Sequence, residues 1–247
     1  MVTALVTGGA GGLGRAAASA LSARNVPTAI VDIVNAAEAA AGLAAPSGAP
    51  VIGIACDITS KAELEQAWKE AEDRLGPVGH VVNNAGFWKP GDLLEVTESD
   101  WAASLGVNLT GPFLLSQLAV RNWTQEGRGG SIVHVASSAA LRALMDTKAF
   151  AYGAAKAGLV GLSTHIAVSF GRQGIRSNVV APGTFRSPMS AGRLADPAEE
   201  ARSNAMIPMA RVGEIDEVAS VVAYLLLDAA YVNGVVVPCD GGTVAHM

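Results

Sequence analysis

Short apolar runs alternate with longer alanine-rich segments along most of the chain. The short runs are rich in valine and isoleucine, and two of them, at 28–31 and 131–135, are apolar nearly throughout rather than at every second position. Such strands are buried on both sides, which is typical of a parallel sheet covered by helices. The alternation predicts repeated βαβ units. We expect strands near residues 2–7, 28–33, 50–54, 79–83, 130–136, 175–181 and 235–238.

This pattern predicts an α/β fold, a three-layer Rossmann-type sandwich with a seven-stranded parallel sheet and helices on both faces. No linker interrupts the alternation, so residues 1–247 are expected to form a single domain. The longest connection, 186–208, contains three prolines with helix-compatible stretches between them. Long ordered connections often form binding loops, and we expect a substrate loop or lid here.

Composition narrows the possible partners. Half of the residues are hydrophobic and the formal net charge is −5, without a cluster of basic residues, so neither nucleic acid nor a membrane surface is an expected partner. Cys56 and Cys239 have no second pair, and the four histidines lack the spacing of metal ligands, so we expect free thiols and no metal. No uninterrupted apolar run reaches ~18 residues and no basic segment precedes the first one, so we expect a cytoplasmic protein.

Directly after the first predicted strand, residues 7–14 read Thr-Gly-Gly-Ala-Gly-Gly-Leu-Gly and lead into an alanine-rich helix. Glycines allow a tight turn and a close approach of the backbone to a pyrophosphate, whose charge is favoured at the helix N-terminus. Asp32 ends the second predicted strand, where a carboxylate can accept hydrogen bonds from both ribose hydroxyls. The alternative for the glycine segment is a plain strand-to-helix turn, and the alternative for Asp32 is a helix cap. Together, the two features indicate a nucleotide site.

Tyr152 and Lys156 lie four residues apart and share one face of a predicted helix. An ammonium group near a phenol favours the phenolate, so we expect a Tyr152 pKa below the usual ~10 and a side chain suited to acid–base chemistry. On its own, such a pair is usually a coincidence on the surface. Here Gly153 and its alanine neighbours leave room for a ligand against the helix.

Over essentially its whole length, the sequence resembles the single-domain branch of the short-chain dehydrogenase/reductase family. The resemblance is carried by the glycine motif at Thr7, Gly8, Gly12 and Gly14, by Asn83-Asn84-Ala85-Gly86, by Tyr152 and Lys156, by Asn108, by the Pro-Gly turn at 182–183 and by the run 208–219. It implies an NAD(H)-dependent oxidoreductase that interconverts a secondary alcohol and a ketone, and a homo-oligomer, with a tetramer favoured over a dimer. Small residues in the helices around 101–122 and 151–172 favour such packing.

The resemblance assigns site residues as follows. The catalytic residues would be Asn108, Ser137, Tyr152 and Lys156. The cofactor-binding residues would be Gly8, Gly12, Leu13, Gly14, Asp32, Ile33, Asp57, Ile58, Asn84, Ala85, Gly86, Tyr152, Lys156, Pro182, Gly183, Phe185 and Ser187. Ser187 takes the place of the family's usual threonine and keeps its hydroxyl. Pro112 has no N–H, so in a continuous helix the Asn108 carbonyl would be left to hold a water for a proton relay.

Two positions depart from the family pattern. Strand register places the substrate-binding serine at Ser137, but the family's usual thirteen-residue spacing from Tyr152 falls on Ala139. Ser138 therefore stays open, with Ser137 favoured because strand register is the stiffer constraint. Asn233 replaces a threonine in a structural turn.

Asp32, together with Gly11 in place of a basic residue, favours NAD over NADP. The rival interpretations are a 3-oxoacyl carrier-protein reductase and a nucleotide-binding regulatory protein that lost the chemistry.

Arg142 and Arg186 could meet an acidic substrate, but exposed loop arginines are more often solvated. The sequence leaves open the substrate and the physiological direction. An apolar pocket, suited to a cyclic or aromatic alcohol, is expected from Phe87, Trp88, Leu141, Leu144, Met145, Phe150, Phe185 and Met189.

Overall fold

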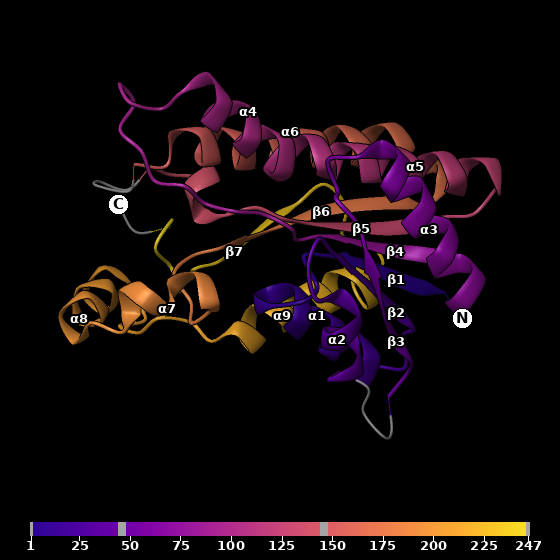
Figure 1. Ribbon diagram of the computed structural model, residues 1–247, viewed down its shortest axis with the longest axis horizontal. Coiled ribbons are helices and arrows are strands. Elements are labelled where there is room, and N and C mark those ends of the chain that lie inside the picture. The colour runs from indigo at the N-terminus through magenta and orange to yellow at the C-terminus, as the bar shows by residue number, and fades with distance from the viewer. Residues whose placement is uncertain (1, 44–47, 144–147, 246–247) are drawn as a thin grey trace.

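The computed structural model describes residues 2–43, 48–143 and 148–245. A parallel sheet runs through its centre with the strand order β3-β2-β1-β4-β5-β6-β7 (Figure 1). Each of the seven predicted strands is present to within one residue at either end. They are β1 (Thr3–Thr7), β2 (Thr28–Asp32), β3 (Val51–Ala55), β4 (Val78–Asn83), β5 (Gly130–Val135), β6 (Ile175–Pro182) and β7 (Val236–Cys239).

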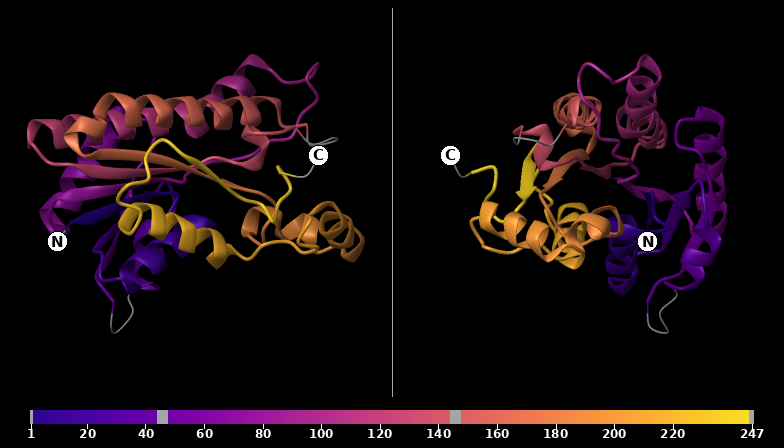
Figure 2. Two further views of the ribbon diagram at one scale, coloured as in Figure 1. Left: turned by 180° about the vertical axis from the view of Figure 1, so that it is seen from behind. Right: turned by 60° about the vertical axis from the view of Figure 1, so that its left-hand side comes forward.

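Helices cover both faces of the sheet, which confirms the predicted three-layer architecture (Figures 1 and 2). One face carries α1 (Gly12–Ala23), α2 (Ala36–Ala41) and α9 (Ile215–Leu227). The other carries α3 (Lys61–Leu75), α5 (Gly111–Gln125) and α6 (Phe150–Phe170), with α4 (Glu98–Leu105) leading into α5. Short turns of helix, η2 (Ser138–Ala140) and η3 (Gly171–Gln173), lie at the two ends of α6.

The two core layers follow from the alternation of side chains along each strand. In β1, Ala4 and Val6 pack in the layer beside α1 and α9, whereas Leu5 packs in the layer beside α3 and α5. All three are at most 1% exposed. A strand buried on both faces must be apolar at every position, which is why the strand segments lack a polar alternation.

One helical stretch, 98–125, is long and apolar enough by length and composition to cross a membrane, yet half of its most apolar window is buried inside the fold. Leu115, Ala119 and Trp123 of this stretch are fully buried against the sheet. The Trp123 indole N–H also donates to the Val78 carbonyl at 2.7 Å. The stretch therefore has the packing of a core helix.

The same stretch is not the continuous α-helix assumed from the sequence. A π-helical turn, η1 (Gly106–Thr110), separates α4 from α5, and the Gly111 N–H donates to the carbonyl of Gly106, five residues back. Pro112 has no N–H to donate to the carbonyl four residues earlier. A π-helical turn is one way in which a helix accommodates this missing hydrogen bond. Asn108 lies inside this widened turn. The expectation of a regular helix around Asn108 was wrong for this reason.

The long connection after β6 folds into two short helices, α7 (Pro188–Leu194) and α8 (Pro197–Met206), which extend beyond the carboxyl ends of the strands (Figure 1). Each helix begins with a proline directly after a capping side chain, Ser187 for α7 and Asp196 for α8. Arg186 joins this region to α9, because its guanidinium binds Glu200 of α8 at 2.5 Å and Glu214 at 3.1 Å. Arg186 is thus a structural clamp and does not line the cleft described next.

Candidate active site

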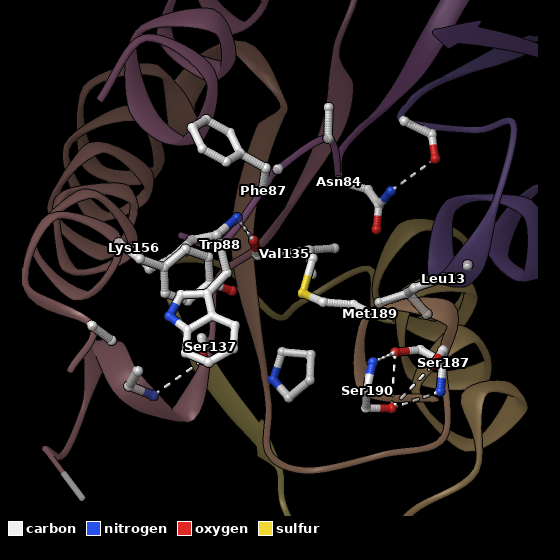
Figure 3. Close-up of a pocket in the computed structure, with 18 of the residues that line it drawn as sticks. Leu13, Asn84, Phe87, Trp88, Val135, Ser137, Lys156, Ser187, Met189 and Ser190 are labelled. Atoms are coloured by element: carbon white, nitrogen blue, oxygen red, sulfur yellow. Dashed lines mark hydrogen bonds between the residues drawn. The ribbon is translucent and has the colours of Figure 1, made fainter. Parts of the chain in front are cut away.

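A cleft of about 1780 Å³ opens at the carboxyl ends of the strands, between the sheet and the helices α7 and α8. Small-molecule pockets are usually about 300–1,000 Å³, so this cleft has room for a dinucleotide and a substrate together. Figure 3 shows Lys156 and Ser137 on one side of the view, Ser187 and Ser190 on the other, and Met189 between them. The location agrees with the rule that ligands of open α/β sheets bind where strands end and the strand order reverses.

The glycine turn has a geometry that only glycine supplies. Gly8 and Gly12 have φ values of +64° and +52°. A Cβ atom on Gly14 would lie 2.2 Å from the Gly8 carbonyl oxygen, so α1 can begin this close to β1 only without a side chain there. Gly11 caps α1 without any side-chain hydrogen bond, which leaves the first N–H groups of the helix to face the cleft. A pyrophosphate fits such a helix N-terminus.

Asn84 holds the end of β4 against this turn. Its amide Nδ2 donates to the Thr7 carbonyl at 2.9 Å and to the Gly8 carbonyl at 3.2 Å. In return, the Thr7 hydroxyl accepts from the backbone N–H groups of Asn84 and Ala85, both at 2.9 Å. Sequence reasoning placed Asn84 and Ala85 among the cofactor contacts. The structure adds that they position the glycine turn, and it assigns Thr7 a part that the sequence reasoning missed.

Two carboxylates lie on the nucleotide side of the cleft. Asp32 accepts from the Ala10 N–H at 3.1 Å through Oδ2, so it ties the glycine turn to β2 and still lines the cleft. Asp57 accepts from the backbone N–H and the hydroxyl of Thr59, both at 2.8 Å. The apolar side chains that line the same part of the cleft are Leu13, Ile33 and Ile58. A ribose between Asp32 and the turn, and an adenine ring beside Ile58, fit this arrangement.

The end of β5 and the first turns of α6 bring three predicted catalytic side chains together. Lys156 donates from Nζ to the Val135 carbonyl at 2.8 Å, and its Nζ lies 5.6 Å from the centre of the Tyr152 ring. Two residues beyond Val135, the Ser137 hydroxyl accepts from the Ala139 N–H at 3.2 Å, and it lines the cleft with Tyr152, whose pKa it lowers as a hydrogen-bond partner. Ser138 also lines the cleft, but Ser137 rather than Ser138 is the hydrogen-bond partner that lowers the pKa of Tyr152.

Burial governs the ionisation of Tyr152 and Lys156. It raises the pKa of the Tyr152 phenol above its ordinary value, and the hydrogen bond with Ser137 opposes only part of that rise. Burial also lowers the pKa of Lys156 to about 8, because the ammonium loses water and gains a single carbonyl partner. We expected a lowered Tyr152 pKa from the sequence, and that expectation was wrong for the protein alone, since desolvation of the phenolate outweighs the hydrogen bond with Ser137.

Asn108 approaches Lys156 across Gly86. Its Nδ2 donates to the Phe87 carbonyl at 2.9 Å and to the Ser104 carbonyl at 3.1 Å. A Cβ atom on Gly86 would lie 2.7 Å from Asn108 Oδ1 and 3.2 Å from Lys156 Nζ, so a glycine is needed for this approach. Asn108 Oδ1 is buried and accepts no hydrogen bond from any residue that the structure describes. A buried acceptor of this kind is usually satisfied by water.

A buried polar cluster that the sequence reasoning missed lies behind the catalytic side chains. Asn83 Nδ2 lies 3.0 Å from the Ser116 hydroxyl and 3.3 Å from His134 Nδ1, and Ser116 donates to the Pro112 carbonyl at 2.6 Å. All three polar side chains are at most 1% exposed. Burial lowers the pKa of His134 to about 3, and the positive charge of Lys156 adds to the effect. The cluster ties β4 and β5 to the helix that follows Asn108. Two polar residues at the ends of neighbouring apolar strands were the available signal.

After β6, the predicted cofactor contacts divide into two groups. Pro182, Gly183 and Phe185 line the cleft as expected. Ser187 also lines it, but its hydroxyl caps α7 through a reciprocal pair of hydrogen bonds with Ser190. The hydroxyl therefore has a structural duty in addition to any contact with a ligand.

The substrate end of the cleft only partly matches the expected pocket. Phe87, Trp88, Phe185 and Met189 line it, whereas Leu141 and Phe150 are exposed and do not. Leu144 and Met145 lie outside the described residues. Met206 of α8 is an apolar lining residue that the sequence did not suggest. The cleft wall is nevertheless mainly apolar, as predicted.

Comparisons with known proteins identify the family. A family model described as enoyl-(acyl carrier protein) reductase matches residues 8–244. An uncharacterised short-chain type dehydrogenase/reductase of Sinorhizobium fredii is 36% identical over 252 residues, covering 99% of this chain and 98% of that protein. The chain therefore belongs to the short-chain dehydrogenase/reductase family of oxidoreductases, whose fold binds a nicotinamide cofactor.

Two solved structures are also similar. The crystal structure of levodione reductase has a TM-score of 0.90 and 34% identity, covering 100% of this chain and 98% of that one. A crystal structure from Agrobacterium tumefaciens with bound NADP has a TM-score of 0.90 and 28% identity, covering 99% of this chain and 97% of that one.

Proposed function

We propose that the protein is an NAD(H)-dependent dehydrogenase that interconverts a secondary alcohol and a ketone. The observation that carries the proposal is the Tyr152–Lys156 pair beside Ser137: Lys156 Nζ is held by the Val135 carbonyl at 2.8 Å and lies 5.6 Å from the centre of the Tyr152 ring, in the same cleft as the glycine turn. Each of these features also occurs in proteins with no such activity. Together, they support an acid–base role for Tyr152 and a hydroxyl-donor role for Ser137 next to a site that fits a dinucleotide.

In the oxidative direction, Ser137 orients the substrate oxygen and Tyr152 accepts the proton of the hydroxyl group as the C–H bond breaks. The nicotinamide, when bound, accepts the hydride. With a pKa of about 8, Lys156 is mostly an ammonium at neutral pH and stabilises the phenolate of Tyr152 electrostatically. The buried Oδ1 of Asn108 faces the Lys156 side chain and could hold a water that returns the proton to solvent. Reduction of a ketone uses the same groups in reverse.

NAD is the proposed cofactor because of the charge at the ribose end. A free 2′-hydroxyl can donate to the Asp32 carboxylate, whereas a 2′-phosphate would place two negative groups together. The Arg15 guanidinium, the cation nearest to the glycine motif in sequence, is directed at the Gly42 carbonyl, 3.5 Å from its Nη2. Gly11, where a basic residue would favour NADP, has no side chain. A 3-oxoacyl carrier-protein reductase that prefers NADPH is the rival that this arrangement disfavours.

The proposed assembly is a homotetramer in the cytoplasm. Trp101 of α4 and Phe113 of α5 are 42% and 43% exposed, and Val168 of α6 is 79% exposed, so the outer surfaces of neighbouring helices carry apolar side chains. Such exposed apolar side chains favour association between copies of the chain.

The free thiols of Cys56 and Cys239 suit a reducing compartment, which supports the cytoplasm as the proposed location. Light scattering at micromolar concentration tests the assembly, and a particle of 25.0 kDa would refute it.

The direct test of the function is a panel of secondary alcohols assayed with NAD and with NADP. We expect reduction of the cofactor by at least one cyclic or aromatic secondary alcohol, with a higher kcat/KM for NAD than for NADP. The reverse assay uses the corresponding ketones with NADH. Binding of NADH without turnover of any alcohol or ketone would contradict the proposal and favour the regulatory interpretation.

A further inference from the structure

The charges that line the cleft are unevenly distributed. The wall formed by α7, α8 and the segments around η2 and the start of α6 contributes Arg142, Lys148, Arg193 and Arg202, against the single carboxylate of Glu199. The whole chain has a formal net charge of −5, so this wall departs from the overall balance. Low-dielectric walls focus such a local field, which attracts ligands of the opposite charge.

Arg193 differs from Lys148 and Arg202 of this wall in its partner. Lys148 is paired with Asp92 at 3.3 Å, and Arg202 with Glu199 at 3.4 Å. Arg193 donates from Nη1 to the Ser203 hydroxyl at 2.7 Å, and among the residues that the structure describes it has no carboxylate within ion-pair distance. The charge of Arg193 is therefore not neutralised within the described part of the chain.

The Arg193 guanidinium is also held in place. Ser203 is 2% exposed, and its hydrogen bond joins the last turn of α7 to α8. A guanidinium group has five N–H donors in a rigid plane, and the Ser203 bond uses one of them. A planar donor with its orientation already fixed loses little entropy when it binds a carboxylate or a phosphate in a bidentate manner. An arginine that is only solvated does not need a hydrogen bond to a buried hydroxyl group, so the Ser203 contact favours a binding role for Arg193.

We propose that Arg193 binds an anionic group, a carboxylate or a phosphate, on the substrate of the dehydrogenase proposed above. Met189 and Met206 lie on the same two helices as Arg193 and Ser203 and line the same cleft, so the substrate has an apolar part next to its charged end. Figure 3 shows Met189 directed into the space between the Ser137 side and the α7 side. Arg193 thus selects substrates by charge at a distance from the atoms that react. The inference rests on the proposed function.

The test compares ketones that carry an anionic group with neutral partners that keep the same reacting carbonyl. Straight-chain oxo acids from 4-oxopentanoate to 8-oxononanoate are paired with their methyl esters, and acetoacetyl-coenzyme A is paired with the neutral N-acetylcysteamine thioester of acetoacetate. For each pair, kcat/KM for the ketone is measured with NADH as the cofactor. The Kd of each ketone for the enzyme–NADH complex is measured from the change in NADH fluorescence. Because hydrogen bonds to charged groups are the strong ones, we expect at least one anionic member to be preferred by about tenfold or more. A preference for an oxo acid that Arg193→Gln abolishes identifies a carboxylate, and a preference for the coenzyme A thioester that Arg193→Gln abolishes identifies a phosphate.

Variants separate the charge of Arg193 from its structural contact. Arg193→Gln should reduce the preference for the anion to near parity, and Arg193→Lys should restore part of it. Ser203→Ala removes the anchoring hydrogen bond but keeps the charge, so it should weaken the preference less than Arg193→Gln does. Arg172→Gln is the matched control, because it removes the same charge from η3, which precedes β6 and lies outside the cleft lining.

The possible failures are distinguishable. If neutral ketones are reduced as efficiently as their anionic partners in every pair, or if Arg193→Gln leaves an observed preference unchanged, the role of Arg193 is overturned while the dehydrogenase activity stands. If no ketone of either kind is bound or reduced, the proposed function fails and the inference fails with it.

Discussion

The nucleotide half of the cleft and the catalytic half are built from different materials. Around the nucleotide site, glycines and backbone groups make the surface, and Gly14 approaches the Gly8 carbonyl more closely than any side chain would allow. Around Tyr152, buried polar side chains lie in and behind a mainly apolar wall, and burial lowers the pKa of Lys156 to about 8 and that of His134 to about 3. A phosphate needs only converging N–H groups, whereas proton transfer needs ionisable groups in a dry environment. Disturbing the two halves should therefore have different consequences.

The largest effect is expected from Tyr152→Phe in the catalytic half. This change removes the oxygen that transfers the proton and keeps the ring, so turnover should fall by roughly 10²–10⁴-fold. The Kd for NADH, measured by fluorescence, should stay nearly the same, because the nucleotide half is untouched. Retention of more than about a tenth of the wild-type kcat would exclude Tyr152 as the acid–base group.

The second prediction separates the two candidate serines. Ser137→Ala removes the hydrogen bond to Tyr152 and should lower kcat/KM by about 100-fold, roughly 2.7 kcal/mol of transition-state stabilisation. Ser138→Ala is the matched control and should have a much smaller effect, since the hydrogen bond of Tyr152 is made with its neighbour. Steady-state kinetics with one substrate suffices, and the opposite order would assign the role to Ser138.

The third prediction concerns stability in acid, to which the catalytic half should contribute through His134. The pKa of His134 falls from the ordinary 6.5 to about 3, so between these values the unfolded chain binds a proton that the folded chain does not. The free energy of unfolding therefore decreases as the pH falls below 6.5, by about 1.4 kcal/mol for each pH unit. Urea unfolding at pH 6.5 and at pH 4.5 should show a smaller loss in His134→Gln than in the wild type.

His80 provides a check on this assignment, because burial also lowers its pKa, to about 4, and it lies in β4. His80→Gln should remove a separate part of the same acid sensitivity. An identical pH dependence in the wild type and in both variants would show that neither buried imidazole controls it.

The smallest effect is expected in the nucleotide half, where cofactor choice depends on one carboxylate. At an effective dielectric constant of ~20, like charges ~4 Å apart repel by about 4 kcal/mol, and screening to half of that still gives about tenfold selectivity or more. Asp32→Ala should narrow the ratio of kcat/KM for NAD over NADP by about that factor. If the wild-type enzyme uses both cofactors equally, or if the variant keeps the ratio, Asp32 does not bind the ribose.

Gly11 sharpens this test. Its φ of −153° suits any residue, and a Cβ atom added there would meet nothing within 4 Å, so Gly11→Arg is sterically free. In the Asp32→Ala background, Gly11→Arg should shift the ratio further toward NADP. Gly11→Gln is the uncharged control, and an equal shift with it would show that size rather than charge is responsible.

The sequence by itself determined the architecture and the chemistry at each strand end. Seven apolar runs predicted seven strands because a strand covered on both faces must be apolar at every position. The four-residue spacing of Tyr152 and Lys156 predicted a shared helix face, because helical geometry is local. The glycine motif predicted the tight turn after β1 for the same reason, since the backbone geometry of a turn is set by a few neighbouring residues.

Tertiary structure decided the properties that depend on distant residues. The raised pKa of Tyr152 follows from burial, which its neighbours in sequence do not reveal. Asn83, Ser116 and His134 form one cluster although they come from β4, α5 and β5. Arg186 and Arg193 look alike in sequence, yet one is neutralised by Glu200 and the other is held by Ser203. Desolvation and charge pairing depend on the whole surroundings of a side chain, and these are assembled only when the chain folds.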